Sequence, residues 1–84
     1  MIFTVTWAAA PVQMLADIWN RATDRTAVAI AADEIDRELR VDPDTLGRPS
    51  GDNRRTYRHA PLAVEFEVDE PNRIVTVLTV WRIA

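Results

Sequence analysis

The chain has 84 residues, a net charge of −3 and no cysteine, which allows one domain with one modest core and excludes a disulfide framework. It has no run of about 18 apolar residues, so no transmembrane helix is expected. The amino terminus lacks the basic and apolar regions of a signal peptide. With one histidine and no thiolate, a structural zinc site is not expected either. We therefore expect a single cytoplasmic domain, 1–84, without a metal or a cofactor.

The first half of the chain predicts one strand and two helices. Residues 2–7 are β-branched or aromatic and alternate, which favours a strand. Pro11 suits the first turn of a helix, and the apolar stripe that follows includes Trp19, which is predicted to lie in the core. A second stripe predicts another helix from about Arg25 to Arg40, with Thr23 or Asp24 available as its N-cap. The short link between the helices predicts an antiparallel helical hairpin.

The second half predicts a loop and three strands. Residues 46–53 hold both glycines, show no periodicity and are predicted to form a loop. Strands are predicted over 54–58, 62–68 and 73–81, with a turn at 69–72. Because short turns join these strands, they should form an antiparallel meander. We predict an α+β fold with the order β-α-α-β-β-β, in which the helical hairpin packs on one face of a twisted, mainly antiparallel four-stranded sheet.

The last predicted strand is apolar on both faces, which is typical of a central strand that is covered from both sides. Counting alternate residues assigns to one face Ile74, Leu78 and Val80, and to the other Val75, Val77 and Trp81. The helical hairpin can cover only one face. We therefore predict that the second set forms an apolar strip that binds a protein partner. The alternative covers are the loop at 46–53 and a second copy of the chain.

Basic residues cluster in one segment of this acidic chain. The cluster contains four guanidinium groups, a phenol and an imidazole, from Arg48, Arg54, Arg55, Tyr57, Arg58 and His59. Such groups can bind phosphates, stack on a base and transfer a proton. On a strand, the three odd-numbered residues should share one face and the even-numbered ones the other. The alternative is a solvated edge strand that its charges protect from aggregation.

Two segments carry a resemblance to a known family: FTVTWAAAPVQMLADIW and RRTYRHAPLAVEFEVDEPNRIVTVLTVWR. They are similar to the RelE/ParE superfamily, the toxin components of bacterial toxin–antitoxin modules. The first resembles that family's strand, alanine-rich entry and helix. The second resembles its basic strand, hydrophobic strand, acidic turn and valine-rich last strand. The resemblance covers nearly the whole chain and implies a toxin that a cognate antitoxin holds inactive.

The resemblance implies two modes of action. RelE-like members cut mRNA on the ribosome without a metal, and ParE-like members inhibit DNA gyrase. Of the two modes we predict inhibition of translation by mRNA cleavage, in which Arg55 and Arg82 would bind and stabilise the phosphate, and Tyr57 or His59 would stack or transfer a proton. The chain departs from the ribonuclease pattern because Ala63 replaces an expected arginine and no Tyr or His follows the last strand. The alternative is a non-enzymatic binding module, either a gyrase inhibitor or an inactive relative.

Overall fold

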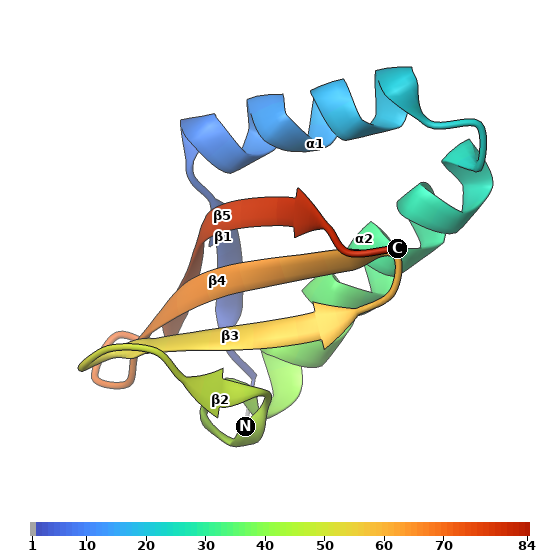
Figure 1. Ribbon diagram of the computed structural model, residues 1–84. Helices are drawn as coiled ribbons and strands as arrows, with labels where there is room; N and C mark the ends of the chain where they lie inside the picture. Colours follow the sequence, from blue (N-terminus) through green and yellow to red (C-terminus); the bar gives the residue numbers. More distant parts are fainter. Residues whose placement is uncertain (1) are drawn as a thin grey trace.

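The computed structural model describes residues 2–84, and its helices and strands lie close to the predicted bounds (Figure 1). In chain order the elements are β1 (Thr4–Trp7), α1 (Ala9–Arg21), α2 (Arg25–Val41), the 3₁₀ helix η1 (Pro43–Thr45), β2 (Arg48–Pro49), β3 (Arg54–His59), β4 (Leu62–Asp69) and β5 (Ile74–Arg82). The α+β class and the two helices are confirmed. The predicted order of elements lacks η1 and β2, so it is wrong in that part of the chain.

The sheet is mixed and has five strands in the order β1-β5-β4-β3-β2. β1 pairs with β5 in parallel, and the other neighbouring strands are antiparallel. The predicted four-stranded sheet is therefore wrong by one strand. The additional strand is β2, which lies inside the predicted loop and pairs with Arg55 and Thr56 of β3. A strand of two residues is too short to show an alternating pattern, so periodicity could not reveal it.

Gly47 allows the chain to enter β2. It has a positive φ of 63°, and a Cβ atom at this position would lie 1.9 Å from the backbone oxygen of Thr56. Only glycine tolerates both this backbone conformation and this close approach. The glycine that marked the segment as a loop is thus the residue that lets it lie against β3.

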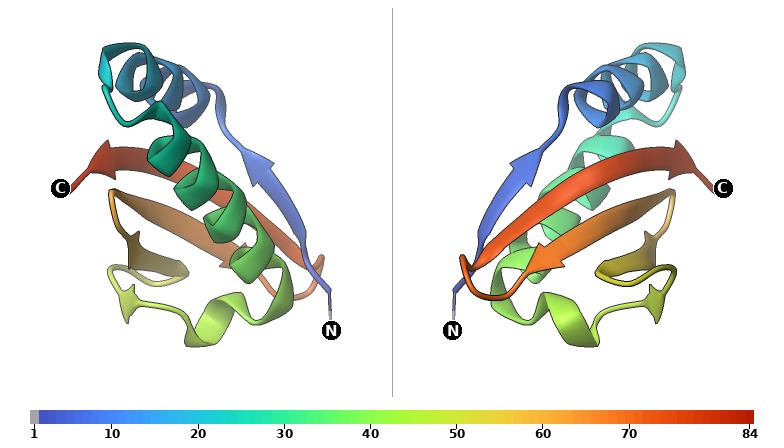
Figure 2. Two further views of the ribbon diagram at one scale, coloured as in Figure 1. Left: turned by 90° about the vertical axis from the view of Figure 1, so that its right-hand side faces the viewer. Right: turned by 90° about the vertical axis from the view of Figure 1, so that its left-hand side faces the viewer.

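The two helices lie on the same side of the sheet, and Figure 2 shows the opposite face without a helix. α1 lies alongside β5, and α2 crosses behind the sheet (Figures 1 and 2). The fully buried side chains of α2 and the sheet form the core: Val28, Ile35, Leu39, Leu62, Val64, Phe66, Val75, Val77 and Val80. Burying a side chain of this size contributes about 1.5–3 kcal/mol. We call the sheet side that carries no helix the open face.

A β-bulge in β5 changes which side chains face the core. Val77 pairs with Phe66 and Thr79 pairs with Glu65, which leaves Leu78 without a direct partner on β4. An extra residue of this kind shifts the alternation of all residues that follow it. The sequence contains no glycine or proline at this point that would have indicated a bulge.

The bulge overturns the predicted apolar strip. Val75, Val77 and Val80 are all fully buried against the helices, and only Trp81 lies on the open face. Val75 and Val77 therefore cannot form a partner-binding surface with Trp81. The error arose because strict alternation was counted through a position where the strand does not alternate.

Candidate functional site

The side chains of β3 point to two opposite faces of the sheet. Arg55, Tyr57 and His59 lie opposite buried residues of β4 and so point toward α2. Arg54 and Arg58 alternate with them and so point to the open face. The basic cluster of the sequence is therefore divided into a helix-side set and an open-face set.

Arg55 stabilises the chain segment before β2 through hydrogen bonds. Its Nε donates a hydrogen bond to the carbonyl oxygen of Leu46 at 2.6 Å, and Nη2 donates to that of Gly47 at 3.1 Å. These bonds fix the segment from which β2 begins. Two donors of the proposed phosphate-binding fork are thus already used inside the protein.

Tyr57 is held by α2. Its hydroxyl donates a hydrogen bond to the Glu38 carboxylate. Burial, the hydrogen bond to Glu38 and the nearby negative charges of Glu38 and Glu34 raise the pKa of Tyr57 to about 12. The phenol therefore keeps its proton at neutral pH and cannot act there as a general base.

His59 is held by the same helix. Its Nε2 lies 2.6 Å from Oε2 of Glu34. Burial lowers the pKa of His59, but the hydrogen bond to Glu34 and the surrounding carboxylate charges outweigh burial, so the net shift is upward. Glu34 and Glu38 are one helical turn apart, about 6 Å, and the two strand residues that they hold are about 6.6 Å apart. The sequence did not predict these contacts, because charged residues along a helix usually face solvent.

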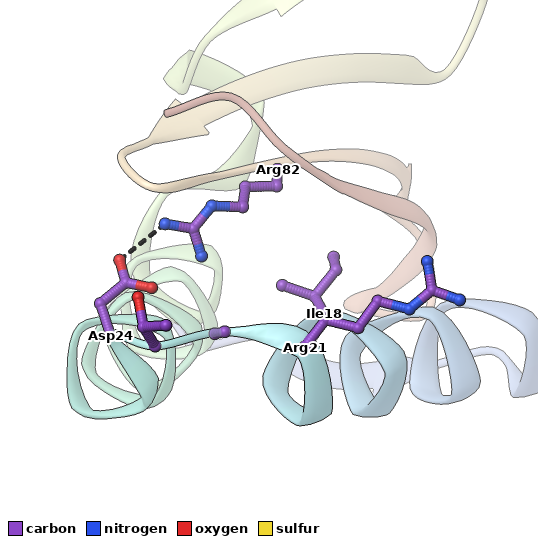
Figure 3. Close-up of a pocket in the computed structure, with 6 residues that line it drawn as sticks. Ile18, Arg21, Asp24 and Arg82 are labelled. Atoms are coloured by element: carbon purple, nitrogen blue, oxygen red, sulfur yellow. Dashed lines mark hydrogen bonds and ion pairs between the residues drawn. The ribbon is translucent and has the colours of Figure 1, made fainter.

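Arg82 lies at the far end of β5, where it pairs with the link between α1 and α2. Its Nη2 is 2.6 Å from Oδ2 of Asp24 (Figure 3). The hydrogen bond that Arg82 donates to Asp24 lowers the pKa of the Asp24 carboxyl group. The same bond raises the pKa of the Arg82 guanidinium. Asp24 therefore precedes α2 without the predicted capping bond. The ion pair borders a cavity of 350 Å³ that Ile18 and Arg21 also line.

Arg55 and Arg82 do not meet. Arg55 lies opposite Phe66, and Arg82 lies opposite Leu62. These two β4 positions are about 13 Å apart along the strand. The pair proposed to hold one phosphate is therefore split between two ends of the sheet, and each member has its own intramolecular partner.

The open-face set has a different environment. Arg48, Arg54 and Arg58 are exposed and take part in none of the ion pairs found within residues 2–84. Trp81 lies on the same face with 36% of its surface exposed. Ala63 lies between Arg58 and Trp81 in the register and is fully buried. This face presents unpaired guanidinium groups next to an aromatic ring.

A second exposed surface is a groove between α1 and α2. It has a volume of 400 Å³ and is lined by Val12, Leu15, Ala16, Trp19, Asn20, Val28, Ala29, Ala32 and Asp33. Trp19 is 42% exposed and Val12 is 52% exposed. The predicted core position of Trp19 is therefore wrong. The guanidinium of Arg25 stacks on its ring, 4.6 Å from the centroid, and the sequence pattern could not separate this groove from the core.

The structure also gives two negative findings for residues 2–84. No group of three or more His, Asp or Glu side chains in this part of the chain is arranged to hold a metal ion. Over the same residues, no helix combines the length and apolar character needed to cross a lipid bilayer.

Comparison with known proteins identifies the fold through structure. No family model and no curated protein matches the sequence. A chain of the toxin–antitoxin complex RelBE2 from Mycobacterium tuberculosis is 15% identical and matches with a TM-score of 0.80, covering 98% of this chain and 99% of that chain. A chain of the chromosomal ParDE system from P. aeruginosa matches at 0.68 with 18% identity, covering 99% and 98%.

A chain of the archaeal RelE-RelB complex from Pyrococcus horikoshii OT3 gives a TM-score of 0.72 at 14% identity and covers 100% of this chain and 98% of that chain. The three matches extend over essentially the full length on both sides. The protein therefore has the RelE/ParE fold, and the resemblance seen in the sequence is confirmed at the level of the fold.

Proposed function

We propose that this protein is the toxin of a toxin–antitoxin module and that an antitoxin protein neutralises it. The observation that carries the proposal is the full-length match to chains of three toxin–antitoxin complexes. The proposal also agrees with the resemblance of the two sequence segments to the RelE/ParE superfamily.

The groove between α1 and α2 is the surface that we assign to the antitoxin. Its apolar lining with exposed Val12 and Trp19 fits the apolar face of an amphipathic helix. Asp33 lies at its border, and acidic residues outnumber arginines in the first half of the chain. Charge complementarity therefore favours an antitoxin helix with basic residues beside its apolar stripe.

The mode of action that we propose is binding to the target through the open face. The competing hypothesis is mRNA cleavage on the ribosome by Arg55, Tyr57, His59 and Arg82. Each of those four side chains already has an intramolecular partner. Within residues 2–84 the open-face arginines form no ion pair, so they are better placed to contact a ribosome, an mRNA or DNA gyrase.

The first test is growth after the protein is induced alone in a bacterial host. We expect growth arrest. Arg48→Ala/Arg58→Ala should relieve the arrest, whereas Tyr57→Phe/His59→Gln should not, because the second pair lies on the helix side. Primer extension on cellular mRNA and a DNA supercoiling assay would identify the target. Normal growth with soluble, folded protein would overturn the toxin proposal, and relief by the second pair together with cut mRNA would restore the cleavage hypothesis.

The second test addresses the antitoxin surface. Genomic fragments of the source organism would be selected for restoring growth against the unchanged protein. Trp19→Glu should keep toxicity, because it lies away from the open face, but should weaken the rescue. Gln13→Glu also adds one negative charge, at an exposed residue of α1 that does not line the groove, and is the matched control. Equal rescue of both variants would contradict the assignment of the groove.

A further inference from the structure

The two outer strands of the sheet differ in how they are protected against pairing with another strand. β2 has only two residues, the charged Arg48 and Pro49, which has no N–H to donate. Short length, charge and proline all discourage pairing at a sheet edge. β1 lies at the opposite edge, and its four residues include no charge and no proline. Its threonines, valine and tryptophan all favour strands, so β1 is the less protected edge.

The hydrogen bonds between β1 and β5 show which backbone groups of β1 are free. Thr4 and Ala8 donate their N–H groups to oxygens of the chain segment that forms β5. In a parallel pair, every second residue of a strand bonds to the same neighbour. The backbone groups of Val5 and Trp7 therefore point away from β5. Only β5 pairs with β1, and Figure 2 shows no strand beyond it.

Two contacts with α2 place charged residues along this edge. The Phe3 N–H donates a hydrogen bond to the Arg40 oxygen at 2.7 Å, so the last turn of α2 lies beside Phe3. Further along the strand, Nε1 of the Trp7 indole donates to Oδ1 of Asp36 at 3.4 Å. Arg40 is therefore level with Phe3, and Asp36 is level with Trp7.

The free edge is complementary to a second copy of itself. If two β1 strands pair antiparallel about a two-fold axis at Val5, each Trp7 lies opposite the Phe3 of the other copy. The two Val5 residues then exchange N–H and C=O bonds, and each Trp7 N–H reaches a Phe3 oxygen. Val5 and Trp7 lie level with the buried Val75 and Val77 of β5. The side chains brought together on the helix side are therefore apolar, and such cross-strand pairs stabilise a sheet.

The charges beside the edge are complementary in the same arrangement. Antiparallel pairing brings the Asp36 of one copy level with the Arg40 of the other. Both side chains are accessible, since Arg40 is 49% and Asp36 is 31% exposed. Opposite charges therefore face each other on both sides of the axis, which favours a second copy over an unrelated strand. We propose that two copies of this protein pair through β1 and form a two-fold symmetric dimer with one continuous sheet.

This dimer uses neither of the surfaces assigned under the proposed function. β1 contributes no residue to the groove between α1 and α2, and the open-face arginines lie on β2 and β3. Dimerisation and toxicity are therefore separate properties, and the failure of one proposal would not decide the other.

Sedimentation velocity over a range of protein concentrations tests the dimer. The unchanged protein should show a dimer whose fraction rises with concentration. Arg40→Glu places an acid level with Asp36 of the other copy, and Asp36→Arg places two guanidinium groups level with each other. Each variant alone should dimerise about 10-fold more weakly or not at all, because like charges face each other. An equimolar mixture of the two should restore the dimer, because every pair across the axis is again of opposite charge.

Controls separate pairing through β1 from general effects of charge. Arg37→Glu makes the same charge change at another exposed position of α2 and should dimerise like the unchanged protein. Val5→Pro removes the N–H at the axis and should abolish the dimer. Circular dichroism checks that each variant is folded. A monomer at all concentrations, a mixture that stays monomeric, equal weakening by Arg37→Glu, or a dimer that folded Val5→Pro leaves unchanged would each overturn the proposal.

Discussion

The two faces of the sheet use the same strands in opposite ways. On the helix side, every polar group of β3 has an intramolecular partner: Arg55 binds two carbonyl oxygens, and Tyr57 and His59 bind carboxylates of α2. On the open face, Arg54 and Arg58 of the same strand have no ion-pair partner within residues 2–84. The odd-numbered residues of β3 therefore stabilise the fold, and the even-numbered arginines remain available to a ligand.

Residue type alone is therefore a poor guide to the position of a functional site. An arginine, a tyrosine and a histidine in one strand have the chemistry of a ribonuclease, but a polar side chain that points toward a covering helix must find a partner there. α2 supplies those partners through Glu34 and Glu38. On the other face, Arg54 and Arg58 take part in no ion pair within residues 2–84, which is why we propose that face as the target-binding surface.

The largest expected effect comes from truncating adjacent residues of β4 that point to opposite faces. Phe66 is fully buried under the helices, and Glu67 is exposed on the open face. Phe66→Ala should lower the free energy of unfolding by about 3–5 kcal/mol, because it removes core contacts and leaves a cavity. Glu67→Ala should change it by less than about 0.5 kcal/mol. Urea denaturation measures both, and similar losses would mean that the open face is also covered.

A smaller effect is expected for the two adjacent arginines of β3. Arg55→Ala should lower the free energy of unfolding by about 1–2 kcal/mol, because the carbonyl oxygens of Leu46 and Gly47 lose a charged donor. Arg54→Ala should change it by less than about 0.5 kcal/mol. Hydrogen exchange should show faster exchange at β2 in the Arg55 variant alone. Equal stability of the two variants would show that Arg55 does not stabilise the segment before β2.

The sequence predicted those parts of the fold that depend on local periodicity. Both helices, β3, β4 and β5 follow directly from the spacing of apolar residues. β2 and the bulge at Leu78 were missed because each is a local break in periodicity, and their causes are distant: the approach of Gly47 to Thr56 and the pairing of β5 with β4. A single inserted residue places Trp81 on the face opposite Val75 and Val77, which are buried in the core.

The candidate site was predictable in composition but not in arrangement. The alternation along β3 correctly separated its odd-numbered residues from its even-numbered ones. It could not show which face the helices cover, nor that two carboxylates one helical turn apart on α2 would meet Tyr57 and His59. The groove around Trp19 was missed for a similar reason, since an apolar stripe looks the same whether its outer edge is covered or exposed.

The smallest expected effect is the pH dependence that His59 contributes on the helix side. The pKa of His59 is raised in the folded protein because its bond to Glu34 and the nearby carboxylates outweigh burial. A raised pKa means that the folded state holds the proton more tightly than the unfolded state. The stabilisation should therefore be fully present below about pH 6.5, the ordinary histidine value, and should be lost as the pH rises through the folded-state pKa.

The size of this effect should be below about 1 kcal/mol, because the His59 and Glu34 side chains are 26% and 41% exposed and water screens such pairs. The free energy of unfolding of the unchanged protein should fall as the pH rises above about 6.5, the ordinary histidine value, and that of His59→Gln should not, because glutamine keeps a donor for Glu34 without titrating. An NMR titration of the single histidine checks the pKa directly. A folded-state pKa of His59 at or below the ordinary value would contradict this prediction, because it would mean that Glu34 of α2 does not bind this end of β3. A raised pKa with an unchanged slope in His59→Gln would instead assign the pH dependence to another group.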